Sequence, residues 1–223
     1  MPPSVHWCNV AVMRTLVIET ATPACSVALF EGGTLIDARH EILGRGHAER
    51  LVPMIADLPG KGRADRILVS LGPGSFTGTR IGLAAARALG LAWSASVQGY
   101  GTLTLVAAMA QSVHPDPVLV AMAGGHGEWF VQPFGFDAAP LSPHQSMPPE
   151  RAASLFDAQV VAGSVADAFV RLRGAGCPLP LLPDAREAVR LPEGALTAAP
   201  AAIYGRPPDA VAQDGLAPRQ RNG

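Results

Sequence analysis

The stretch that most constrains the fold runs from Leu71 to Trp93, where a glycine-rich loop is followed by a helical sequence. A short β-branched run, residues 67–70, predicts a buried strand directly before the loop. Glycine and proline in Gly72-Pro73-Gly74 favour a turn, and either Ser75 or Thr77 can cap the helix that follows. The stretch therefore predicts a strand, a tight turn and a helix.

Small residues recur at every fourth position of this predicted helix, so one of its faces carries little side-chain bulk. They are Gly78, Gly82, Ala86 and Gly90. Each glycine inside a helix costs about 1 kcal/mol relative to alanine, so close approach of another backbone is the expected compensation. A helix packed on its own sheet and a helix packed on a partner protein meet this requirement equally well. A membrane-spanning helix does not, because Arg80 and Arg87 interrupt the sequence.

The same loop is a weak candidate for phosphate binding. A nucleotide P-loop ends in Gly-Lys-Ser/Thr, and this loop contains no lysine. The dinucleotide pattern Gly-x-Gly-x-x-Gly fits Gly72, Gly74 and Gly78 only with one residue too many in the second gap. A structural turn followed by a capped helix is the favoured interpretation.

Composition and charge narrow the class of protein. The chain has 223 residues, 48% of them hydrophobic, so it can bury a large core. The formal net charge is -1 and the basic residues are dispersed, so strong direct binding of nucleic acid is not expected. Cys8, Cys25 and Cys177 are far apart, and no secretory signal is apparent, so we expect a cytoplasmic protein. Residues 1–12 are expected to be an N-terminal extension, with Met13 as a second candidate start.

The order of predicted elements indicates two similar α/β halves. Three strands, a helix, a strand and a helix occupy residues 13–113, which is the order of a ribonuclease-H-like unit. A further helix is predicted over Leu103–Gln111. Two prolines in His114–Pro117 predict a boundary, and a shortened version of the same order follows over residues 114–206. Residues 207–223 are expected to form a loose tail.

Candidate ligand-binding residues do not form a convincing site. No two histidines have the i, i+4 spacing of a helical metal site. Glu19 ends the first predicted strand where actin-like ATPases carry an acidic residue, but the next turn, Thr22-Pro23-Ala24, has no glycine to approach a phosphate. The corresponding turn of the second half, Ala123–Gly127, has glycines but no acidic residue for Mg²⁺. Neither a cofactor nor a metal is therefore expected.

Three segments of the chain together resemble the bacterial TsaB family. They are Leu16–Thr22, Arg45–Leu51 and Gly72–Gly82. The similarity is strong from Met13 to about Ala110 and thin after Pro117. It implies an actin-like ATPase (ASKHA) fold, an α/β fold of two ribonuclease-H-like halves, of which the second is shortened and diverged. It also implies a non-catalytic subunit that supports TsaD, which transfers threonylcarbamoyl from threonylcarbamoyl-AMP to N6 of the adenosine beside the tRNA anticodon.

The resemblance places a protein interface on the first two helices. Carried over by motif, its residues are His47, Arg50, Leu51, Met54, Phe76, Gly78, Thr79, Arg80, Gly82, Leu83, Ala86 and Arg87. The implied partner is TsaD, or a second copy of the chain, with TsaE as a third component and tRNA contacted only through the complex. The small residues would then let helices of two subunits pack closely. On this interpretation Gly82→Leu leaves a folded protein that no longer associates.

Two departures from the family argue further against nucleotide or metal binding. Many relatives carry aspartate where Glu19 stands, and an Asp-Ala-Arg-like segment where Ala123-Gly124-Gly125 stands. The alternative is a homodimeric enzyme of the same fold, either a small ATP-dependent kinase or a peptidase-like hydrolase. Ser75, His47 and Asp37 could be imagined as the triad of such a hydrolase, but no nucleophile-elbow pattern surrounds Ser75. A homodimer with an unrelated binding role is a third possibility.

Overall fold

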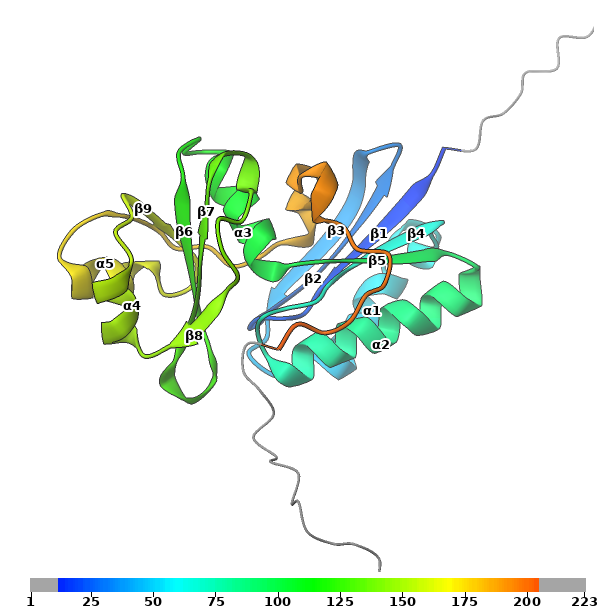
Figure 1. The fold of residues 1–223 in the computed structure, drawn as a ribbon. Coiled ribbons are helices and arrows are strands. Elements are labelled where there is room, and N and C mark those ends of the chain that lie inside the picture. Colours follow the sequence, from blue (N-terminus) through cyan, green and yellow to red (C-terminus); the bar gives the residue numbers. More distant parts are fainter. Residues whose placement is uncertain (1–11, 205–223) are drawn as a thin grey trace, which may run out of the picture.

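Two α/β halves, each built on a five-stranded sheet, make up the part of the chain that the structure describes (Figure 1). The structure is a computed structural model, and it describes residues 12–204. The predicted tail, residues 207–223, and all but the last residue of the predicted extension, residues 1–12, lie outside the described residues.

The first half is a mixed sheet covered on both faces. In chain order its elements are β1 (Arg14–Glu19), β2 (Ala24–Glu31), β3 (Thr34–Ile42), α1 (His47–Ala56), β4 (Arg66–Ser70), α2 (Phe76–Trp93), β5 (Ser96–Tyr100) and α3 (Thr102–Gln111). The strand order is β3-β2-β1-β4-β5. Strands β1, β2 and β3 form an antiparallel meander, whereas β4 and β5 run parallel to β1. This order confirms the predicted ribonuclease-H-like unit.

Both faces of β1 are buried, which explains the three consecutive apolar residues at its centre, Leu16–Ile18. Alternate side chains point to opposite faces of a strand, so Leu16 and Ile18 pack with α1 and α2, while Val17 packs under α3. Helix α3 also contributes Leu103 and Val106 to the core of the second half, so it lies between the two sheets (Figure 1).

The second half repeats the topology of the first with shorter elements. They are β6 (Val118–Ala123), β7 (Trp129–Phe134), β8 (Gln145–Met147), α4 (Pro149–Leu155), β9 (Val160–Ala162), α5 (Ala166–Arg173) and β10 (Cys177–Leu179). The strand order β8-β7-β6-β9-β10 matches that of the first sheet, with β7 antiparallel and β9 parallel to β6. The expected fold, two ribonuclease-H-like halves with a shortened second half, is therefore confirmed.

Three edge strands are present that the sequence did not predict: β5, β8 and β10. Each is three to five residues long, and none is a continuous apolar run. Strand β5 contains Gly99, β10 contains Pro178, and β8 follows a proline-rich loop. Such residues are tolerated at sheet edges, where fewer ladder hydrogen bonds are needed, and they obscure the signal that apolar alternation gives elsewhere.

The chain returns to the first half after β10. The short helix η4 (Ala185–Arg190) packs over β1, β2 and β3, on the face opposite α1 and α2. Residues Thr197–Tyr204, here called the C-terminal strap, then run beside β5 and α2, as the orange segment in Figure 1 shows. The predicted domain ranges, 13–113 and 114–206, stay a prediction, but part of the second range contacts the first half.

Candidate partner-binding surface

The glycine-rich loop is held by hydrogen bonds to its own half of the protein. Ser75 is the cap of α2, since its Oγ accepts a hydrogen bond from the Gly78 N–H at 3.2 Å. The Ser75 N–H donates to the Ala21 carbonyl at 2.7 Å, and the Gly72 carbonyl accepts from the Thr102 N–H at 2.9 Å. The amide that a phosphate would need at Ser75 is already used, which supports the turn-and-cap interpretation.

The small residues of α2 face the sheet of their own half. A Cβ atom built on Gly78 would lie 2.1 Å from the Thr20 carbonyl oxygen, and one built on Gly82 would lie 2.3 Å from Thr20 Oγ1. A Cβ atom on Gly90 would lie 2.5 Å from Val97, and Ala86 is fully buried. Explaining the small residues by close packing of two subunits is therefore wrong. For Gly82→Leu the structure favours a different outcome from a folded protein that no longer associates, because leucine there would disrupt the fold itself.

His47 is buried rather than on the surface. Its Nε2 lies 2.9 Å from the Thr22 carbonyl oxygen, so the side chain ties the start of α1 to the turn between β1 and β2. The same turn holds α2, because Thr20 Oγ1 donates a hydrogen bond to the Gly78 carbonyl at 2.8 Å. One turn therefore fixes the starts of both helices.

Most of the residues carried over by motif are not available for direct contact with a partner. Those buried in their own half are His47, Leu51, Met54, Gly78, Thr79, Gly82, Leu83 and Ala86. Arg50 is half-buried and forms an ion pair with Glu41 of β3. Phe76, Arg80 and Arg87 are exposed.

A different set of α1 and α2 residues forms the outer surface of the two helices, which pack beside each other. We call it the paired-helix face: Ala48, Glu49, Val52, Pro53 and Ala56 of α1, and Thr77, Ala84, Ala88 and Leu91 of α2. Val52 is 59% exposed and Leu91 is 87% exposed. The face is largely apolar and built from small side chains. Helical periodicity could have located it, because these positions lie opposite the buried stripe of each helix.

An aromatic and basic cluster adjoins this face at the start of α2. The Arg80 guanidinium carbon lies 3.6 Å from the centroid of the Phe76 ring. Arg80 also donates from Nε and Nη2 to the Tyr204 hydroxyl, at 3.2 and 3.1 Å. Arg87 Nη2 donates to the Pro200 carbonyl at 2.7 Å. The sequence did not indicate Tyr204 or Pro200, because nothing local links them to α2.

Glu19 lies fully buried at the end of β1. Its Oε1 accepts a hydrogen bond from the Ala21 N–H at 2.8 Å, and its Oε2 accepts from the Tyr100 hydroxyl at 3.3 Å. Burial raises the pKa of this carboxyl to about 7. Glu19 is enclosed by its own half, so it is not placed to bind a metal or a nucleotide. Within residues 12–204 no three His, Cys, Asp or Glu side chains are grouped to hold a metal ion.

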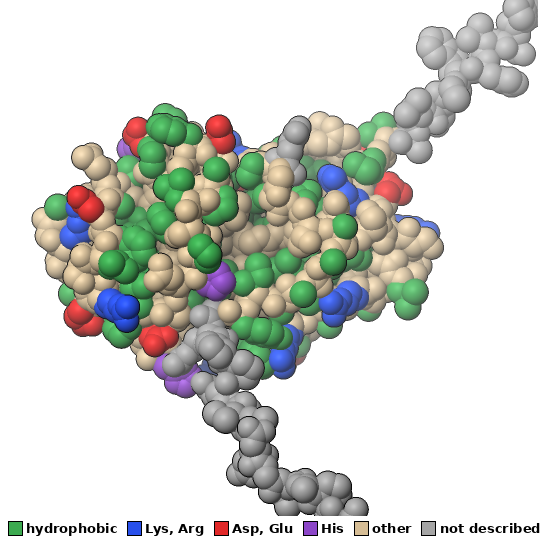
Figure 2. All heavy atoms as spheres, viewed as in Figure 1, with side chains coloured by type: hydrophobic (Ala, Val, Ile, Leu, Met, Phe, Trp, Pro, Cys, Tyr) green, Lys and Arg blue, Asp and Glu red, His purple; other side chains and the backbone are tan. Residues whose placement is uncertain are grey.

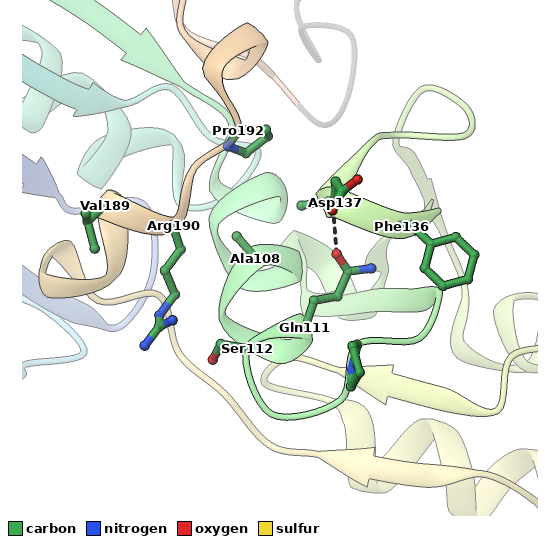
Figure 3. Close-up of a pocket in the computed structure, with 10 residues that line it drawn as sticks. Ala108, Gln111, Ser112, Phe136, Asp137, Val189, Arg190 and Pro192 are labelled. Carbon is green, nitrogen blue, oxygen red and sulfur yellow. Dashed lines mark hydrogen bonds between the residues drawn. The ribbon is translucent and has the colours of Figure 1, made fainter.

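A pocket of about 590 Å³ lies at the end of α3, between the loop at Asp137 and the returning segment that carries Val189 and Arg190 (Figure 3). Its main polar side chain, Gln111, already serves the fold. Gln111 accepts from the Ala138 N–H at 2.6 Å and donates to two backbone carbonyls. Arg190 is paired with Glu187. The pocket therefore offers few free polar groups to a ligand.

The surface shown in Figure 2 carries Lys and Arg side chains at separate places, not in one basic patch. None of the helices in the described part of the chain is both long and apolar enough to span a membrane.

Comparisons with known proteins show what this chain is similar to. A model described as "TsaD: tRNA N6-adenosine threonylcarbamoyltransferase" matches residues 39–135, which is less than half of the chain. The tRNA threonylcarbamoyladenosine biosynthesis protein TsaB of Escherichia coli (strain K12) is 42% identical over 100 residues, 43% of this chain and 43% of that protein. The protein of the same name from Haemophilus influenzae is 34% identical over 114 residues, 49% of this chain and 48% of that protein. These matches support the TsaB family as the one that this chain resembles.

The structural likeness extends over both halves of this chain. A Pseudomonas aeruginosa crystal structure, described as an uncharacterized protein with similarity to peptidase YEAZ, superposes with a TM-score of 0.73 at 27% identity. The match covers 87% of this chain and all of that one. The sequence matches, in contrast, span less than half of the length of either TsaB protein.

Proposed function

We propose that this chain is a non-catalytic subunit that binds TsaD through its paired-helix face. In this role it supports the transfer of threonylcarbamoyl from threonylcarbamoyl-AMP to N6 of the adenosine beside the tRNA anticodon, in the cytoplasm. The observation that carries the proposal is the paired-helix face itself, where exposed Val52 and Leu91 stand among small side chains. Contiguous exposed apolar surface of this kind marks sites of protein association. The names of the relatives support the pathway, and the match to the TsaD family model supports TsaD as the partner.

TsaE is proposed as a third component, and a second copy of the chain occupies the paired-helix face when TsaD is absent. Contact with tRNA is proposed to occur only through the complex, because the formal net charge of -1 and the dispersed basic side chains do not favour direct binding.

The proposal that the chain is not a catalyst rests on the hydrogen-bond partners of the candidate catalytic side chains. Ser75 Oγ accepts from Gly78, His47 Nε2 bonds to the Thr22 carbonyl, and Asp37 pairs with Arg39. None of these bonds joins one member of the imagined triad to another. The geometry therefore does not favour the hydrolase alternative.

The experiment is a reconstituted reaction that contains tRNA, threonylcarbamoyl-AMP, TsaD and TsaE of the same organism, with this chain present or omitted. Omission is expected to lower the rate of tRNA modification at least tenfold. An equal rate without the chain would contradict the proposal. Turnover of ATP or a peptide by the chain alone would instead favour the enzyme alternative.

A Val52→Asp variant should lower the modification rate at least tenfold at limiting concentration of the chain. A carboxylate buried at an interface without a partner costs about 2 kcal/mol or more, and about 1.4 kcal/mol corresponds to tenfold in affinity. Leu172→Asp is the matched control, since Leu172 is an exposed apolar residue of α5 in the other half. If both variants act alike, or neither has an effect, the paired-helix face is not the docking surface.

A further inference from the structure

We propose that the C-terminal strap is a third element of the partner-binding surface. In this role it holds Arg80 and adds Tyr204, so that the surface recognises a partner helix carrying two acidic side chains. The inference rests on the proposed function, and it names the chemistry of the partner that the proposed function leaves open.

The strap is fixed against the first half at two points. Thr197 and Gly99 exchange two backbone hydrogen bonds of 2.9 Å, so the strap begins by extending the edge of the sheet at β5. The Ile203 N–H donates to the Leu71 carbonyl at 2.7 Å, and Ile203 packs against the core under α2. These backbone hydrogen bonds therefore fix the position of Tyr204 near the start of α2.

Tyr204, Phe76 and Arg80 lie together at the start of α2, and residues of these kinds are common in protein interfaces. Tyr204 is 44% exposed and Phe76 is 55% exposed, and their ring centroids are 5.3 Å apart. The Arg80 guanidinium lies over Phe76 and is held by the Tyr204 hydroxyl. Tyrosine and arginine are enriched among the few residues that carry most of the energy of an interface. The three side chains form one exposed, partly preorganised contact site.

The charge of α2 indicates what the partner must carry. Helix α2 contains two arginines and no acidic residue, and in Figure 2 blue and green side chains lie together over it without red. Arg80 and Arg87 form no ion pair within residues 12–204; their bonds are to a phenol and a carbonyl. Each guanidinium has five donors and therefore keeps some of them free.

The spacing of Arg80 and Arg87 indicates how far apart the acidic side chains of the partner must lie. Arg80 and Arg87 are seven residues apart, so they lie two turns apart on one side of α2, about 10 Å along its axis. Carboxylates with the same separation, i and i+7 on a helix of the partner, would face both guanidinium groups. The apolar paired-helix face beside them would meet the apolar part of the same helix.

The test measures the dissociation constant for TsaD of the same organism by titration calorimetry, with the full chain. Tyr204→Ala is expected to weaken binding at least tenfold, and Tyr204→Phe is expected to weaken it less, because the ring on Phe76 is retained. Arg80→Ala is expected to weaken binding and to make it less sensitive to added salt, because an ion pair is screened by salt. Arg171→Ala, at an exposed arginine of α5, is the matched control and should bind as the wild type does.

The outcomes separate this inference from the proposed function. If the wild type binds and Val52→Asp does not, while Tyr204→Ala binds as tightly as the wild type, the inference is overturned and the docking surface stands. Tighter binding by Tyr204→Ala would also overturn it, since the strap would then hinder the binding of TsaD. If the wild type fails to bind TsaD at all, both are overturned. Unfolding temperatures of the variants close to that of the wild type establish that lost binding is not lost folding.

Discussion

A Gly78→Ala variant should lose about 4 kcal/mol or more of its free energy of unfolding, enough to leave much of the protein unfolded. The added Cβ atom would lie 2.1 Å from the Thr20 carbonyl oxygen, and a contact this short forces α2 away from the end of β1. Moving backbone costs more than moving a flexible side chain, and overpacking of the core is among the few mechanisms that produce losses above about 4 kcal/mol. The helix propensity gained, about 1 kcal/mol, is too small to compensate.

The measurement is urea unfolding followed by circular dichroism. The control is Ala84→Leu, which adds a larger side chain to the same helix at an exposed position and should change the stability by about 0.5 kcal/mol or less. A Gly78→Ala protein as stable as the wild type would contradict the tight contact between α2 and Thr20. It would also restore the interpretation in which the small residues of α2 face a partner.

A Glu19→Gln variant should be more stable than the wild type at pH 8, by about 3 kcal/mol, and should differ little from it near pH 4. Burial raises the pKa of Glu19 from 4.5 to about 7 in the folded protein. Between these values the folded state keeps a proton that the unfolded state has released, so the wild type loses stability as the pH rises from 4.5 to 7. The gain corresponds to the difference between the two pKa values at about 1.4 kcal/mol per unit.

Urea unfolding at a series of pH values from 4 to 8 measures this difference, with Glu150→Gln on the exposed first turn of α4 as the control. The profile of the control should follow that of the wild type, whereas the profile of Glu19→Gln should be flatter. If the free energies of unfolding of Glu19→Gln and the wild type change with pH in parallel, Glu19 ionises in the folded protein without loss of stability.

The parts of the fold that the sequence predicts are those with strong local signals. Glycine or proline turns separate the strands of the β1–β2–β3 meander and of the pair β6–β7, and a glycine-rich turn precedes α2. The structure confirms all of these predicted elements. The edge strands β5, β8 and β10 lack that signal. The strap is bound by contacts between residues far apart in the sequence, such as Arg80 and Tyr204, which are 124 positions apart. No local pattern encodes such a contact.

The candidate site shows the same limit. The sequence predicts that α1 and α2 are helices, because the glycine turns before both helices and the Ser75 cap of α2 are local features. The motifs do not identify the exposed side of each helix, because many motif residues, such as His47 and Gly82, serve the internal contacts that hold the helices in place. Exposure places the paired-helix face on other residues, among them Val52 and Leu91.

The most direct test of the central claim is the mass of the chain in solution when it is mixed with TsaD of the same organism, measured by light scattering after size-exclusion chromatography. The account predicts a peak at the summed mass of one chain and one TsaD for the wild type and for Leu172→Asp, and separate peaks for Val52→Asp. A wild-type chain that elutes apart from TsaD, or a Val52→Asp variant that still forms the complex, would contradict it.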